Sequence, residues 1–127
     1  MIRMTRRMAL AMPALLAPLS AYAQWAPARP LRFVVPFAAG GATDIVARVL
    51  SEPMTERLGQ PVAIENRTGA GGNVGVENIV RSAPDGLSIL MGTTGTLTIN
   101  PHLYANMGFN PLTDLAPIGL AFARITC

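Results

Sequence analysis

The sequence has no lysine, one histidine and one cysteine among its 127 residues. A single cysteine, Cys127, excludes an intramolecular disulfide and a thiolate metal site. The absence of lysine excludes a P-loop, whose phosphate-binding motif requires that residue. The only histidine, His102, has no ligand-spaced partner, and the sequence contains no G-x-S-x-G nucleophile motif. We therefore expect a protein that is not an enzyme and that has neither a metal nor a cofactor.

The chain also has no excess of positive or negative charge once its first 23 residues are set aside. The ten basic residues are all arginine and stand against seven acidic residues, which gives a formal net charge of +3. Three of the arginines are Arg3, Arg6 and Arg7, so the chain from Gln24 onward has seven of each sign. These seven arginines are scattered rather than clustered, which argues against nucleic-acid binding.

The first 23 residues have the layout of a secretory signal peptide. The basic start is followed by an apolar stretch over residues 8–19, and Ala21, Tyr22 and Ala23 form a small-x-small cleavage site. The apolar stretch is shorter than the roughly 20 residues that a membrane-spanning helix needs, so we expect no permanent anchor. The pattern predicts export with cleavage after Ala23, by either the general or the twin-arginine route.

Downstream, strand and helix patterns alternate. Apolar runs rich in β-branched residues predict strands over residues 31–35, 61–65 and 87–91, and a further strand over 115–122. A 3.6-residue apolar period predicts a helix from Ala42 or Thr43 to Leu58, kinked or split at Pro53, and a second over 74–82. This alternation is typical of βαβ units, which predicts an α/β fold with a parallel sheet.

Small-residue loops follow each of the first three predicted strands. They lie at residues 38–44, 69–73 and 92–96, and the carboxyl ends of parallel strands meet at one edge of a sheet. Their backbone N–H groups, with those of the helix starts, would bind an anion or a carboxylate without a cationic side chain. The alternative is that the glycines only make tight turns and that Thr43 or Asp44 only caps a helix. A dinucleotide fingerprint is excluded, because Val74 occupies the position of its third glycine.

Four segments in order resemble the Bug-type receptors, the extracytoplasmic solute-binding proteins of tripartite tricarboxylate transporters. They are residues 31–44 (LRFVVPFAAGGATD), 58–75 (LGQPVAIENRTGAGGNVG), 83–96 (APDGLSILMGTTGT) and 100–104 (NPHLY). The resemblance implies a periplasmic-binding-protein-like fold of type II, with two α/β lobes and a ligand cleft between them. It implies small carboxylate ligands, namely di- and tricarboxylates, acidic amino acids or aromatic acids, and membrane transporter components as partners.

The resemblance also implies which residues contact the ligand, through two loops that pinch a carboxylate. Asp44 would face an amino or hydroxyl group of the ligand, or a water. The implied ligand-binding residues are Ala39, Gly40, Gly41, Thr43, Asp44, Gly92, Thr93, Thr94, Gly95 and Thr96.

Compared with the family, the chain corresponds to only the first part of the receptor's length. We expect residues 24–127 to form a partial first lobe, with the second lobe missing, and therefore weak ligand binding and marginal stability. Two alternatives to uptake stay open: a binding protein that presents its ligand to a membrane kinase, and an exported enzyme of small-acid metabolism.

Overall fold

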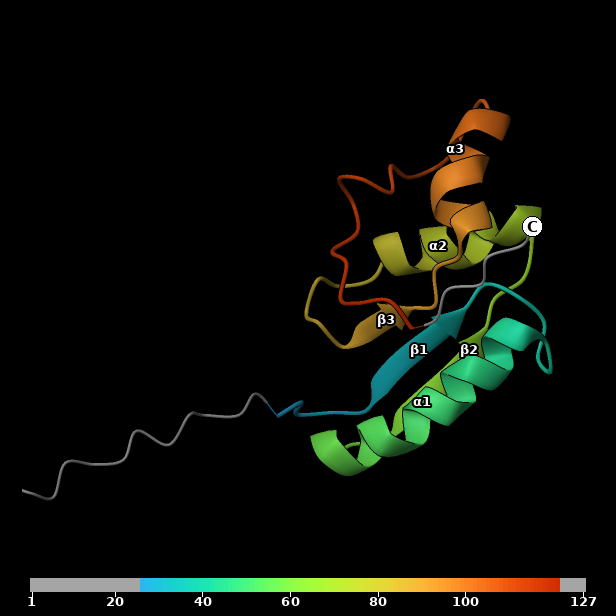
Figure 1. Ribbon diagram of the computed structural model, residues 1–127. Coiled ribbons are helices and arrows are strands. Elements are labelled where there is room, and N and C mark those ends of the chain that lie inside the picture. Colours follow the sequence, from blue (N-terminus) through green and yellow to red (C-terminus); the bar gives the residue numbers. More distant parts are fainter. Residues whose placement is uncertain (1–25, 122–127) are drawn as a thin grey trace, which may run out of the picture.

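The computed structural model describes residues 26–121, which form a small three-layer α/β unit (Figure 1). Three strands, β1 (Leu31–Val35), β2 (Val62–Asn66) and β3 (Ser88–Leu90), make one sheet in the order β2-β1-β3. Both pairings are parallel, with Phe33 opposite Ile64 on one side and Ile89 on the other. The predicted α/β fold with a parallel sheet is confirmed.

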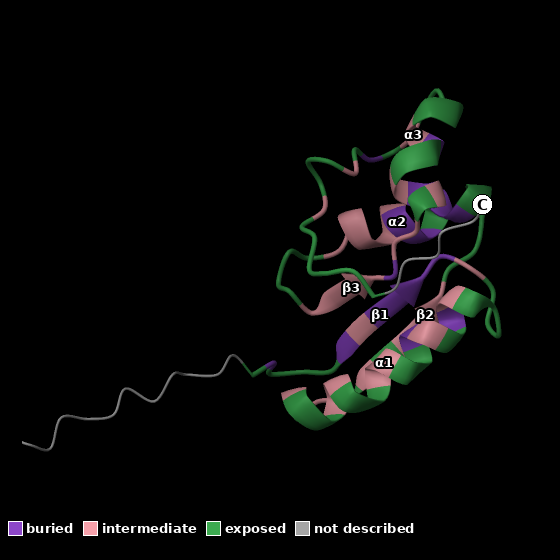
Figure 2. Ribbon diagram, viewed as in Figure 1, coloured by how far each residue is buried: buried purple, intermediate pink, exposed green. Residues whose placement is uncertain are grey.

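The core forms around β1, the central strand, and is most deeply buried there (Figure 2). Phe33 and Val35 pack with Ala47 of α1 (Ala42–Leu58) and with Met91, which follows β3. Val34 points to the other face, which α2 (Asn73–Val80) covers with the fully buried Val76. A central strand that is apolar on both faces is what a parallel sheet with helices on both sides requires.

The first helix begins and ends where the sequence predicts, and it is not split. Its stop is Gly59, whose φ of +67° is a left-handed conformation that glycine adopts without strain. Pro53 lies inside the helix and cannot donate to the carbonyl of Val49. Val49 is 66% exposed, so water can satisfy that carbonyl. Of the two outcomes predicted at Pro53, a kink or a split, the split does not occur.

The region after β3 differs most from the prediction. Residues 92–96, predicted as a loop, run into a π-helical turn, η2 (Gly95–Ile99), and the short helix α3 (Asn100–Leu103). Thr93 starts this helical segment, since its carbonyl accepts from Leu97 N–H at 3.0 Å. Glycine and threonine have low helix propensity, which hid the segment from sequence patterns.

The strand predicted over residues 115–122 is not formed as far as Ala121, the last residue described. Ile118 and Leu120 are each 82% exposed there, and the outer edge of β3 pairs with no strand in the described part. A strand without a neighbour leaves its N–H and C=O groups unpaired, so an apolar sequence alone does not make one. The predicted signal peptide, residues 1–23, and Cys127 lie outside the described residues.

A polar cluster joins the sheet to α2 near the start of β1, where Arg32 lies. The Arg32 guanidinium donates to both carboxylate oxygens of Glu65, at 2.9 and 3.0 Å, and also to Asn78 Oδ1 at 3.0 Å. Arg67 donates to Glu65 at 3.2 Å. These bonds, led by the one from Arg32, lower the pKa of Glu65 to about 2.

We predict that this ion pair makes stability depend on pH. Because the folded pKa of Glu65 lies below its ordinary 4.5, its contribution is complete above about pH 5 and is lost as pH falls to about 2. Glu65→Gln should lower the free energy of unfolding at pH 7 by about 1 kcal/mol and by much less near pH 2, where about half of the folded molecules carry a protonated Glu65. Urea unfolding at several pH values measures both. Glu52→Gln, on the exposed face of α1, is the control, and an equal loss in both variants would contradict the prediction.

Candidate functional site

Three loops converge at the carboxyl edge of the sheet. Gly72, in the loop after β2, is buried between the other two: a Cβ built on it would lie 2.6 Å from Cγ2 of Thr96 and 3.3 Å from Cζ of Phe37. The φ of Gly72 is +96°, which glycine adopts readily. The sequence-based expectation that these loops share one rim is confirmed.

A buried carboxylate organises the first loop. Asp44, in the first turn of α1, is 1% exposed and accepts three hydrogen bonds. The donors are Arg48 Nε at 2.8 Å, Gly40 N–H at 2.8 Å and Asn66 Nδ2 at 2.9 Å. The bond from Arg48, followed by those from Gly40 and Asn66, lowers the pKa of Asp44 well below its usual range, so the group is ionised.

Asp44 therefore has partners other than those the resemblance implies. Its two oxygens accept from donors inside the protein, and its side chain is only 2% exposed, so little of it can be reached from the rim. Gly40 likewise uses its N–H on Asp44, and Gly41 donates to the carbonyl of Ala38 at 3.3 Å. In this structure these groups shape the loop.

The start of α1 keeps donors free at the rim. The first N–H groups of a helix have no intrahelical acceptor. Within residues 26–121, no acceptor lies within hydrogen-bond distance of the backbone N–H groups of Ala42, Thr43 and Asp44. Ala39 and Ala42 are exposed beside them and carry no bulky side chain. This part of the rim suits an anion.

The second predicted loop, residues 92–96, also has free N–H groups, at the start of the helical segment after β3. Thr96 is fully buried, and its hydroxyl accepts from Thr93 N–H at 3.1 Å while Thr93 Oγ1 accepts from Thr96 N–H at 3.3 Å. The N–H groups of Thr94 and Gly95 meet no acceptor in the described part of the chain. Gly92 is a packing position, because a Cβ there would lie 2.5 Å from Leu97 Cδ1.

Two buried asparagines fix the second segment above the loop that follows β2. Asn100 Nδ2 donates to Asn73 Oδ1 at 2.6 Å and to the carbonyl of Gly71 at 3.2 Å. Sequence reasoning missed both residues, and it missed Asn66. The pattern that could have found Asn66 and Asn73 is an asparagine at the end of a strand or directly after a glycine-rich loop, both places where backbone groups need partners.

The ten predicted residues thus belong to one rim but differ in what they offer. Free N–H groups stand at two helix starts, at residues 42–44 and 94–95, and exposed small residues flank them. Gly40, Gly41, Asp44, Thr93 and Thr96 carry groups that are bonded within the protein. Among the described residues no three histidine, cysteine or acidic side chains gather as a metal site, and no helix is long and apolar enough to cross a membrane.

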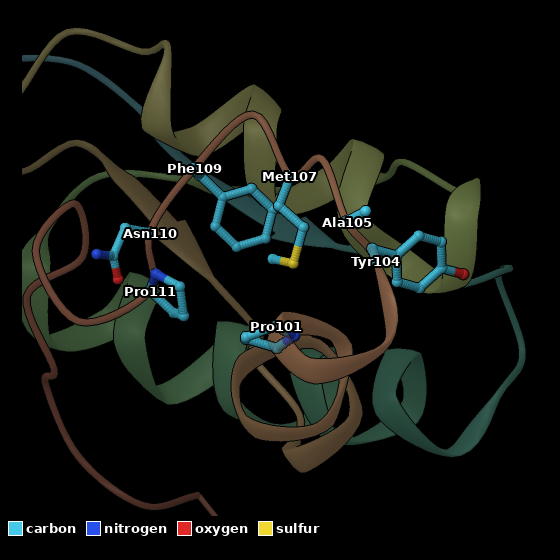
Figure 3. A pocket seen from close by; sticks show the side chains of 7 residues that line it. All are labelled: Pro101, Tyr104, Ala105, Met107, Phe109, Asn110 and Pro111. Atoms are coloured by element: carbon cyan, nitrogen blue, oxygen red, sulfur yellow. The ribbon is translucent and has the colours of Figure 1, made fainter.

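A separate hollow of about 350 Å³ lies beyond α3 (Figure 3). Among its lining residues Phe109 is buried, whereas Tyr104 is 40% exposed. The hollow is lined by Pro101, Tyr104, Ala105, Met107, Phe109, Asn110 and Pro111. None of the ten predicted residues lines it, so it is not the rim described above.

The fold and the rim define the class of protein: part of a lobe of a periplasmic binding protein. Three parallel strands with helices on both faces are an arrangement that the chain shares with solved binding proteins, of which it covers about 30%. Residues 46–125 match the family described as tripartite tricarboxylate transporter family receptor, and the chain belongs to that family. The resemblance seen in the sequence is confirmed.

Individual members of the family show how similar this chain is to known proteins. It is 40% identical to the protein BugT of Bordetella pertussis over 74% of this chain and 29% of BugT. It is 41% identical to MatC of Rhodopseudomonas palustris, solved with bound malate, at a TM-score of 0.67 over 69% of this chain and 30% of MatC. A second R. palustris protein, solved with adipate, is 37% identical at a TM-score of 0.66 over 68% and 29%. The chain spans about a third of the length of the curated relatives it matches.

Gly72 gives a prediction about how closely the three loops must pack. Gly72→Ala should lower the free energy of unfolding by about 2–4 kcal/mol, because a methyl group meets Thr96 and the φ is left-handed. Gly59→Ala is the matched control: its φ is also left-handed but nothing lies within 4 Å of its Cβ, so it should lose only about 1 kcal/mol. Chemical denaturation measures both, and equal losses would contradict close packing at Gly72.

Proposed function

We propose that this chain is the first-lobe part of a receptor that captures small carboxylates for a tripartite tricarboxylate-type transporter. The ligand class is di- and tricarboxylates, acidic amino acids or aromatic acids. The observation that carries the proposal is the pair of helix starts, at residues 42–44 and 94–95, whose free N–H groups lie at one rim. Such groups bind an anion through hydrogen bonds and the helix dipole.

The solved relatives support this ligand class. MatC was solved with malate and another relative with adipate, and both ligands are dicarboxylates. Binding them requires donors for carboxylate oxygens, which the rim offers. It requires no nucleophile or general base, so we propose that the protein binds its ligand without converting it.

One lobe provides only one wall of the cleft in such a receptor. Closure of two lobes removes a ligand from water and adds contacts from the opposite side. The described residues have an open rim in which Ala39, Gly40 and Thr94 are exposed. We therefore expect this chain by itself to bind carboxylates weakly.

Titration followed by nuclear magnetic resonance tests this proposal on the chain from Gln24 onward. Malate at millimolar concentration should shift the amide signals of residues 42–44 and 94–95, because their N–H groups gain an acceptor. The dimethyl ester of malate, which carries no carboxylate, should leave them unchanged. Shifts confined to other residues, or none at all, would refute a carboxylate site at this rim. A micromolar dissociation constant for malate, measured by calorimetry, would refute the expectation that this chain by itself binds carboxylates weakly.

We also propose that the protein acts in the periplasm after removal of residues 1–23. The basic start, the apolar stretch and the Ala21-Tyr22-Ala23 site support it, and members of the family are periplasmic binding proteins. Expression in a Gram-negative host should give a periplasmic product whose N-terminal sequence begins at Gln24. Ala23→Leu should block this cleavage because signal peptidase requires a small residue there, and an unprocessed wild-type product would contradict the proposal.

A further inference from the structure

Asp44 raises an electrostatic question at the proposed carboxylate site. Its ionised carboxylate belongs to the same helix turn whose N–H groups stand free at the rim. A negative charge so close to an anion site repels the ligand, and partial burial weakens the screening by water. A site for carboxylates should not retain such a charge unless the charge is compensated and has a task.

The task of Asp44 is visible in its contacts. Its carboxylate accepts from the Gly40 N–H at 2.8 Å and from Asn66 Nδ2 at 2.9 Å. Asn66 Nδ2 also donates to the carbonyl of Phe37 at 3.0 Å. Both ends of the loop after β1 are thus fixed against the end of β2 and the first turn of α1. Gly40 has a φ of +81°, a conformation that the bond to Asp44 stabilises.

The compensation comes from Arg48, one turn further along α1. Its Nε lies 2.8 Å from Asp44 Oδ2, and its side chain is 57% exposed, so it lies on the solvent side of a carboxylate that is 2% exposed. Among the described residues Arg48 is the one cation paired with Asp44.

We propose that Asp44 and Arg48 are a positioning pair for carboxylate binding. Asp44 holds the loop of residues 37–41 in the geometry that leaves the helix-start N–H groups facing the rim. Arg48 cancels the charge of Asp44, so that an anionic ligand is not repelled. Neither side chain contacts the ligand. The inference rests on the proposed function for its ligand, whereas the loop-holding role can be measured without one.

Two substitutions separate the two roles. Asp44→Asn keeps the shape but removes the charged acceptor of the Gly40 N–H, so the exchange of this amide with solvent should accelerate about tenfold or more. Arg48→Met leaves Gly40 bonded to Asp44 but leaves the charge uncompensated. It should weaken the response of the residue 43 and 94 amides to malate by about three- to tenfold, and more so at low salt.

The double variant and a matched control make the test specific. Asp44→Asn with Arg48→Met removes both charges, so it should recover part of the malate response that Arg48→Met alone loses. Arg81→Met removes an ion pair with the same spacing, to Glu77 four residues earlier on α2, which is more exposed and lies away from the rim. It should leave the malate response unchanged. Amide protection in β1 and β2 verifies the fold of every variant.

The outcomes are distinguishable. Equal malate responses in Arg48→Met and Arg81→Met would overturn the charge-compensating role, and unchanged exchange of Gly40 in Asp44→Asn would overturn the loop-holding role. If wild-type protein shows no response to malate, the proposed function falls together with the role of Arg48, and the Gly40 exchange rate still decides the role of Asp44. If Asp44→Asn fails to fold, the comparison of Arg48→Met with Arg81→Met decides the role of Arg48. The role of Asp44 is then decided in the wild-type protein, where the bonded Gly40 amide should exchange at least about tenfold more slowly than the free Thr43 amide, and equal rates would overturn it.

Discussion

The shape of the rim depends on the hydrogen bonds to the Asp44 carboxylate. They join the loop after β1, the first two turns of α1 and the end of β2. Burying an ionised carboxylate carries a large desolvation penalty unless donors satisfy it. Here three donors do so, and the result is a loop of small residues with one defined shape. The open N–H groups at the start of α1 depend on that shape.

The second half of the rim is held by packing and by neutral hydrogen bonds. Gly72 allows Thr96 and Phe37 to approach each other, and the Asn100 side chain connects the helical segment after β3 to Asn73 and Gly71. The two halves thus differ in kind: one is positioned by an ion pair and the other by close contact. They meet at one edge because all three strands are parallel.

Much of the fold was predictable, because its determinants are local. The apolar run 31–35 and the period of α1 gave the strand and the helix with the observed bounds, and Gly59 gave the stop. The two wrong predictions have a common cause, namely that both segments depend on partners distant in the sequence. The turn η2 is rich in glycine and threonine, and it forms because Thr93 and Thr96 bond to each other and Thr96 is buried against Gly72. The apolar stretch 115–121 looks like a strand, yet the described residues offer it no partner.

The sequence by itself determined the order of strands and helices, the position of the small-residue loops and, through its four motifs, the family. Those features depend on residues that are neighbours along the chain. Only the tertiary structure decided what each rim residue does, because the decisive contacts join distant positions: Asn66 meets Asp44 from 22 residues away, and Asn100 meets Asn73 from 27. Asp44 was predicted to face a ligand group or a water, and the structure adds that its carboxylate accepts from donors that no local pattern could place beside it.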